Sequence, residues 1–227
     1  MRKWHVVVLI AVLLSACTAP GIGVKKYTGF TELKFPSNSL APGQIVEIYS
    51  DPEKVEITYQ PNIPRDKASS SPGWDIASVE ARAASANLEL EIINVLKATG
   101  SSSSSVRAQV QYSNTKTTLV PKYYIYSTLK RDIGSSKSLQ EQLRAYIGNG
   151  TRFDVVTMIL TATVTFKLVD PNNNKLKIDS QVIEKLNSRF GLSFSLSNES
   201  STAISGKDLV IGIHYDPNMV NFILKSI

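Results

Sequence analysis

The sequence predicts an α+β domain, built mainly of antiparallel β-hairpins with three or four helices packed on one side. Three observations lead to this fold class. Apolar and polar residues alternate over long runs, most clearly from Thr157 to Leu168, as expected for strands with one buried face. Turn residues of the Asp-Pro and Asn type separate several of these runs. Other segments have apolar residues three and four apart, and they predict helices.

The first part of the domain predicts a small antiparallel sheet. Phe30 to Phe35 and Ile45 to Tyr49 are short runs rich in β-forming residues. The run from Val55 to Tyr59 alternates apolar and polar side chains. Asp51-Pro52 supplies the turn that joins the last two runs as a hairpin.

The segment from Trp74 to Thr99 predicts a helix. It contains no Gly or Pro, is rich in Ala, and carries apolar residues at spacings of three and four. The alternation of Leu88, Leu90 and Ile92 also allows a strand that begins where the alanines end. Gly100 and the five serines after it predict a flexible loop, so two subdomains are suggested to divide near residues 100–105.

Residues 106 to 148 predict two strands and a helix. Val106 to Tyr112 alternates as a strand does, and Thr117 to Tyr126 is a second β-rich run. Pro121 lies inside the second run, which is therefore an edge strand or two short pieces. Ser138 and Glu141 have the spacing of a capping box that opens a short amphipathic helix.

The long run from Thr157 to Leu168 is the clearest strand, with one apolar and one threonine-rich face. Asp170 to Asn174 then predicts a turn, and Val182 to Phe190 predicts a helix that Gly191 ends. Leu192 to Leu196 and Leu209 to Tyr215 alternate again and complete the sheet.

Asp216-Pro217, after the last strand, suits a turn or the start of a helix. No repeat of fixed period is present, and residues 27–227 have a length that suits one domain. The net charge of +6 falls to +4 without Arg2 and Lys3. This excess is spread along the chain, so it predicts mild attraction to anionic surfaces rather than nucleic-acid binding.

The first seventeen residues have the layout of an export signal. Arg2 and Lys3 precede an apolar run from Val6 to Leu14, which is too short to span a bilayer, for which a helix needs roughly twenty residues. The tetrapeptide Leu14-Ser15-Ala16-Cys17 resembles the lipobox of bacterial lipoproteins.

This resemblance implies that residues 1–16 are a signal peptide and that Cys17, the single cysteine, is acylated with palmitate-type chains. Residues 17–26 would then be the lipidated end and its tether. Thr18 stands where an Asp resembles an inner-membrane retention mark, so the expected location is the outer membrane, facing the periplasm or the surface. In a Gram-positive organism it would be the cell membrane.

Catalytic and metal-binding motifs are missing from the mature sequence. His214 is its one histidine, so we expect no metal site and no cofactor. Ser205 with Asp208 or Asp216 could complete a triad with His214 only in principle, because no nucleophile motif surrounds a serine. The turn from Asp170 to Asn174 lacks the glycine and glutamate of a calcium loop.

An aromatic group suggests a binding surface for glycan or peptide, although its members would equally suit the core or surface of a sheet. It consists of Trp74, Tyr123, Tyr124 and Tyr126.

Three functions stay open. We expect first a non-catalytic binding or scaffolding lipoprotein that docks another envelope protein and binds no nucleic acid. The alternative is a membrane-active β protein of the pore-forming type, suggested by the serine loop and the threonine face of Thr157 to Thr165. The third is an envelope hydrolase using carboxylates, or Ser205 and His214.

Overall fold

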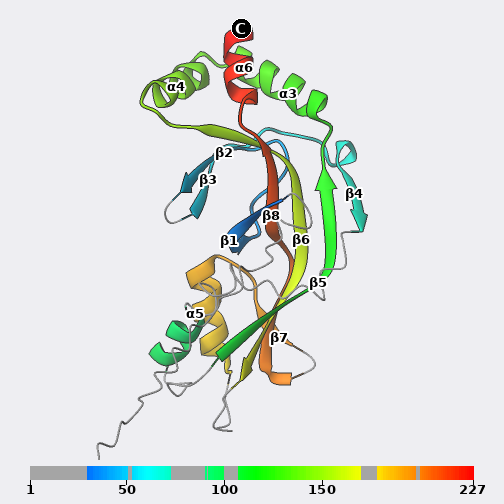
Figure 1. Ribbon diagram of the computed structural model, residues 1–227, viewed down its shortest axis with the longest axis vertical. Helices are drawn as coiled ribbons and strands as arrows, with labels where there is room; N and C mark the ends of the chain where they lie inside the picture. Colours follow the sequence, from blue (N-terminus) through cyan, green and yellow to red (C-terminus); the bar gives the residue numbers. More distant parts are fainter. Residues whose placement is uncertain are drawn as a thin grey trace, which may run out of the picture.

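The computed structural model describes residues 30–50, 53–72, 90, 92–99, 107–169, 178–197 and 200–227. In these parts the chain forms helices and one antiparallel sheet packed together, which confirms the α+β fold class. The molecule is elongated, with strands running along its length and helices gathered at its two ends (Figure 1).

Two long strands form the spine of the sheet. β6 (Phe153–Val169) and β8 (Ser200–Asp216) each contain 17 residues, so each extends about 55 Å at roughly 3.3 Å per residue. They pair antiparallel from Val155 opposite Asp216 to Lys167 opposite Ala203. Every other described strand attaches directly or indirectly to this pair.

Each spine strand has two different neighbours along its outer edge. On β6, β2 (Ile45–Ser50) pairs with the start of the strand and β5 (Arg107–Leu119) pairs with the rest. On β8, β1 (Thr31–Ser37) lies beside Val210 to Ile213, and β7 (Ser195–Ser197) lies beside Ser200 to Ser205. The sheet continues outward with two further strands, β3 (Glu53–Tyr59) on β2 and β4 (Ser69–Pro72) on β5.

The helices gather at opposite ends of the spine. At one end lie α3 (Lys122–Ser135), α4 (Lys137–Gly148) and α6 (Met219–Ser226), which we call the helical end (Figure 1). At the other end lie α5 (Ser180–Phe190) and the helical residues 92–98 (Figure 1). A 3-10 turn, η1 (Arg65–Lys67), precedes β4.

Three clusters of buried side chains follow this arrangement. The largest joins the inward-facing residues of β6 and β8 to α5 and to Ile92 and Leu96, and Phe166 lies in it with its ring 5.4 Å from that of Phe194. A second cluster joins the three helices of the helical end to the start of β6. A third, smaller cluster lies under β1 and β2.

Several predicted elements are confirmed. The first two strands, the hairpin of β2 and β3, and the long strand β6 lie where the sequence placed them. Along β6, buried residues alternate with partly exposed threonines from Thr161 onward. α5 begins after Asp179, whose carboxylate accepts the backbone N–H of Val182, and ends at Gly191 with φ of 62°.

Other predictions fall partly outside the described residues. The helix predicted from Trp74 is present at residues 92–98, and its earlier part lies outside. The subdomain divide at 100–105 and the turn from Asp170 to Asn174 also lie outside. Asp216-Pro217 is a turn that leads into α6, because the N-cap position is Asn218.

Three strand predictions have the wrong bounds. The strand predicted from Leu192 to Leu196 is present only as β7, Ser195–Ser197, and the last strand, predicted from Leu209, begins at Ser200. The two strands predicted after residue 105 are one continuous strand, β5.

Two helix starts are also wrong. Lys122 to Tyr126 is the first part of α3 and not a strand, because Pro121 ends the extended chain and its carbonyl accepts the N–H groups of Tyr124 and Ile125. The helix α4 is present as predicted, but its N-cap is Ser136, whose hydroxyl accepts the N–H of Leu139. The predicted capping box at Ser138 therefore places the start of the helix two residues too late.

Truncating Phe166 tests the largest core cluster. Phe166→Ala should lower the free energy of unfolding by about 3 to 5 kcal/mol, because it leaves a cavity at a fully buried position. Urea unfolding followed by circular dichroism measures this loss. Thr165→Ala, on the opposite face of β6, should cost less than about 1 kcal/mol; equal losses in both variants would contradict the assignment of faces.

Candidate functional site

The predicted tyrosines lie on α3, at the helical end. Ile125, Leu129 and Ile133 recur every four residues on this helix and are fully buried, so they fix which face packs inward. Tyr123 is 75% exposed, whereas Tyr124 and Tyr126 are partly buried. The fourth aromatic residue of the predicted surface, Trp74, lies outside the described residues.

Tyr126 is the member of this group with the most partners from elsewhere in the chain. Its ring lies 5.7 Å from the ring of Phe222 on α6, and its hydroxyl lies 3.4 Å from the hydroxyl of Ser226. The ammonium of Lys130 lies 5.8 Å from the centre of the same ring. α3 and α6 therefore present aromatic and basic side chains together.

Phe222 was missed by the sequence analysis, and it is 63% exposed. On α6 the buried residues Met219, Val220 and Ile223 form the inward stripe, and Phe222 lies off that stripe. An aromatic residue on the outer face of a short amphipathic helix is the sequence signal that would have found it. Tyr146 on α4 is a further exposed aromatic residue, at 45%.

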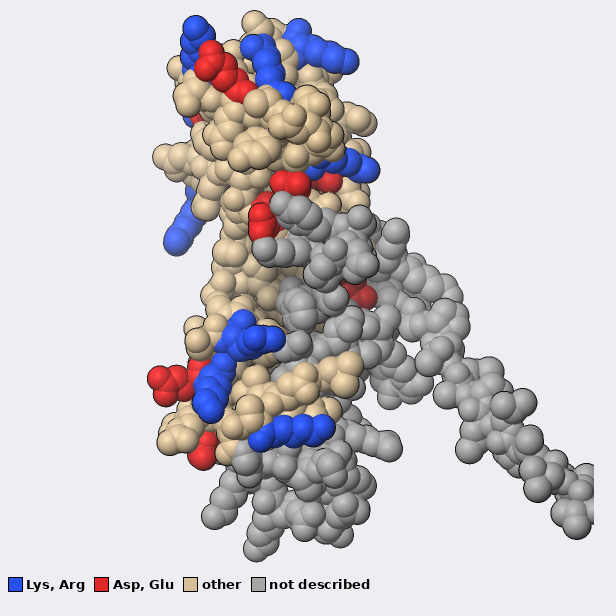
Figure 2. Space-filling model, turned by 90° about the vertical axis from the view of Figure 1, so that its left-hand side faces the viewer, with Lys and Arg blue, Asp and Glu red and all other residues tan. Residues whose placement is uncertain are grey.

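The helical end is basic. Its three helices contain six Lys or Arg and two acidic residues, a net charge of +4. Figure 2 shows basic side chains, with acidic atoms beside them, on one face of this end. The two acids are paired within their helices, Asp132 with Arg131 at 2.9 Å and Glu141 with Lys137 at 3.9 Å. The basic members are Lys122, Lys130, Arg131, Lys137, Arg144 and Lys225.

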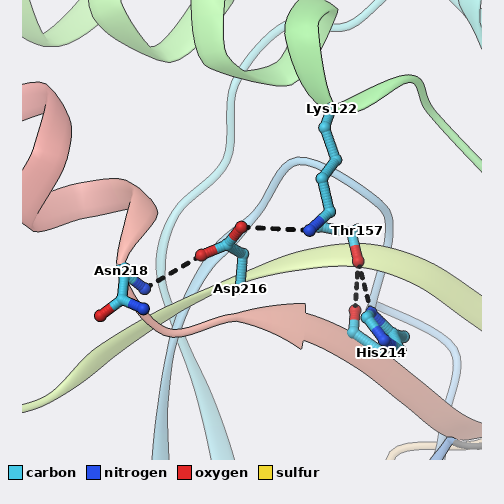
Figure 3. Close-up of polar contacts among 5 residues, drawn as sticks. All are labelled: Lys122, Thr157, His214, Asp216 and Asn218. Atoms are coloured by element: carbon cyan, nitrogen blue, oxygen red, sulfur yellow. Dashed lines mark hydrogen bonds and ion pairs between the residues drawn. The ribbon is translucent and has the colours of Figure 1, made fainter.

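A polar network joins the helical end to the spine (Figure 3). Asp216, at the end of β8, accepts the backbone N–H of Asn218 at 3.0 Å and lies 3.2 Å from the ammonium of Lys122 on α3. Burial alone would raise the pKa of Asp216, but the N–H of Asn218 and the Lys122 ammonium outweigh it, so the pKa lies below the usual 3.8. Asp216 thus ties α3 to the turn before α6.

Asp154, on the neighbouring strand β6, is in the opposite situation. The residue is 2% exposed, and its burial raises the pKa of its carboxyl, although Arg152 at 3.5 Å partly offsets this effect. A raised pKa in the folded state means that this carboxyl lowers stability as the pH rises above its usual 3.8. Arg152 and Asp154 thus form an ion pair in which the carboxylate is buried.

His214 is held on the spine by Thr157. The Thr157 hydroxyl lies 2.9 Å from Nδ1 of His214 and donates to the His214 carbonyl at 3.0 Å (Figure 3). Ser205 lies nine residues away on the same strand, a separation of about 30 Å at ~3.3 Å per residue. In this fold the two side chains do not form the nucleophile and base of a triad.

Among the residues that the structure describes, no three His, Cys, Asp or Glu side chains lie close enough to hold a metal ion. Within the same residues, no helix has the length and apolar character needed to cross a membrane. Cys17 and the residues Leu14, Ser15 and Ala16 before it lie outside the described part of the chain.

Comparison with known proteins shows a low similarity to solved structures. No protein-family model and no curated protein matches the chain. Among solved structures, a bacterial gasdermin from Bradyrhizobium tropiciagri is similar with a TM-score of 0.41 and 11% sequence identity, over 82% of this chain and 81% of the gasdermin. A similarity of this size assigns neither a family nor a function.

Removing the Asp216 carboxylate tests the link between the helical end and the spine. Asp216→Ala should lower the free energy of unfolding at pH 7 by about 1 to 2 kcal/mol, because α3 loses an ion pair and the turn before α6 loses an acceptor. Because the pKa of Asp216 in the folded state lies below 3.8, the full loss of stability should be observed at neutral pH. The loss should become smaller as the pH falls below 3.8, because the carboxylate of the unaltered protein then takes up a proton.

Urea unfolding at pH 7 and pH 3 measures both effects. Asp208→Asn is the control, because it removes an ion pair with Lys116 in which the Asp208 side chain is 73% exposed. This variant should change stability little at either pH. A loss for Asp216→Ala that is the same at both pH values would contradict the role of its charge.

Proposed function

We propose that this chain is a lipid-anchored protein of the bacterial cell envelope, a non-catalytic component that binds another part of the envelope through its helical end. The anchor follows from the signal layout of residues 1–16 and from Cys17 in its lipobox-like setting. Several acyl chains on one residue hold a protein on a membrane almost permanently, since each buried methylene contributes about 0.8 kcal/mol.

The exposed aromatic and basic surface of the helical end carries the binding proposal. Tyr123 and Phe222 are 75% and 63% exposed, so these two large side chains leave most of their surface open to a partner. Aromatic side chains are enriched at binding surfaces, because they provide a large contact area with few rotatable bonds. The proposed location is the outer membrane, with the domain facing the periplasm or the surface.

Site-specific crosslinking in native envelopes tests this function. A photoreactive residue in place of Asn221, beside Phe222, should yield discrete crosslinked products that purify with the protein. The Cys17→Ala form should lose its membrane association and these products together. The same probe at Gln111, an exposed residue of β5, is the control. Equal product patterns from both positions, or none from either, would contradict binding through the helical end.

A membrane-active β protein is the second candidate, and the lengths of the strands favour it. A strand that crosses a bilayer needs about 9 to 11 residues of alternating character. β5, β6 and β8 contain 13, 17 and 17 residues, and β6 has an apolar face opposite its threonines. That apolar face now packs against α5, so insertion would require α5 to leave it.

Dye release from vesicles tests the second candidate. If α5 must separate from β6, Phe166→Ala should release dye faster than the unaltered protein, because Phe166 shares a core cluster with Val182 and Leu186 of α5. Vesicles of phosphatidylethanolamine with phosphatidylglycerol, and with added cardiolipin, cover the common bacterial lipids. Absence of release for both proteins in every composition would rule out this candidate.

A further inference from the structure

We propose that the component bound by the helical end is an anionic lipid surface, so that the protein rests on its membrane through a second contact besides the lipid on Cys17. This inference rests on the proposed function and narrows its partner. The contact is the docking patch, a set of five neighbouring residues on α3 and α6: Tyr123, Tyr126, Lys130, Phe222 and Lys225.

The patch is continuous over both helices. Tyr123 and Tyr126 are three apart on α3, and Lys130 follows Tyr126 by four, so these three side chains share one face. Phe222 packs against Tyr126 with 5.7 Å between ring centres, and Lys225 follows Phe222 by three on α6. Two basic residues therefore flank a strip of aromatic rings.

The charge of the helical end favours anionic lipid over an acidic protein groove. The net charge of +4 is distributed over three helices, and on the face that Figure 2 shows the basic side chains are separate from one another on a rounded end of the molecule. Basic residues distributed over such an end suit a planar layer of headgroups. Each Lys or Arg at such a surface strengthens binding about fivefold.

The aromatic residues fit the same partner. Tyrosine places its ring at headgroup depth and keeps its hydroxyl in water, and a neighbouring Phe extends into the apolar region. Tyr123 and Phe222 have the most exposed large hydrophobic side chains among the described residues of the helical end, at 75% and 63%. The ammonium of Lys130, which lies over the Tyr126 ring, would then be at the level of the lipid headgroups.

The position of β1 brings the anchor and the patch to the same membrane. Thr31 pairs with Ile213, and the chain reaches Asp216, the end of β8, about 10 Å further on. The turn after Asp216 and the length of α6, about 12 Å, cover the remaining distance to the outer tip of the helical end. This tip therefore lies within about 30 Å of Thr31. Thr31 lies fourteen positions after Cys17, a length of chain that can span up to about 46 Å at roughly 3.3 Å per residue.

A fluorescent probe next to the patch tests the inference in the lipidated, full-length protein matured in cells. Asn221→Cys provides the attachment site for an environment-sensitive dye, since acylation occupies the thiol of Cys17, the only natural cysteine. The protein is reconstituted into vesicles of phosphatidylcholine alone or with phosphatidylglycerol. The emission of the dye should shift to shorter wavelength, and lipid-borne nitroxide should quench it, only when phosphatidylglycerol is present.

Two variants define the patch. Lys130→Glu with Lys225→Glu should reduce the membrane-contacting population about 25-fold, from about fivefold per basic residue. Phe222→Ser should abolish quenching by deep nitroxides. The matched control is Lys97→Glu with Lys185→Glu, two exposed lysines on helical segments at the opposite end, which should leave the emission unchanged.

The outcomes separate this inference from the proposed function. A protein that floats with the vesicles but shows the same emission with and without phosphatidylglycerol overturns the lipid contact and leaves the anchored binding protein intact. Crosslinks from position 221 to a protein would then identify the other partner. A protein that does not float with any vesicles overturns both proposals, and equal effects of the two lysine pairs overturn the patch.

Discussion

The pairing of β6 with β8 is the constraint on which the structure depends. These strands hold all the others in register, and their inward-facing residues contribute to the clusters at both ends and in the middle. Because each strand has a different neighbour near either end, the sheet is long and narrow. The helices pack at the two ends of this sheet, and the helical end forms a surface of its own (Figure 1).

Local signals sufficed for most of this fold. The alternation in β6 and in the Leu209 to Tyr215 part of β8, the Asp179 cap and the left-handed Gly191 act within a few residues, so a sequence shows them directly. The beginning of α3 was misjudged because aromatic residues favour strands, whereas the buried spacing of Ile125, Leu129 and Ile133 determines a helix. Tertiary packing outweighed the intrinsic preference there. The two neighbours along each edge of the spine follow from pairings distant in sequence, which no local pattern contains.

The candidate site was only partly predictable for the same reason. Tyr123, Tyr124 and Tyr126 attract attention as a cluster in the sequence, but what makes a surface of them is Phe222 and Lys225, about one hundred positions later. The Lys122 and Asp216 pair is equally remote in sequence. Composition showed a modest positive charge spread along the chain, and the fold concentrates a +4 share of it on three helices. Residues 122–148 alone carry a net charge of +3, and folding adds Lys225 of α6 to this basic stretch.

The direction of β1 has a mechanical consequence. The strand begins on the side nearer the helical end and runs away from it, antiparallel to β8. If the chain is held at its N-terminal side while the body is pulled away along the spine, β1 and β8 slide past each other. The hydrogen bonds of an antiparallel pair lie across the strands, so this sliding loads them at the same time instead of opening them in succession. A protein tethered in this way resists tension at the strand nearest its attachment. If the same strand were pulled so that its hydrogen bonds opened one after another, it would be the first to separate.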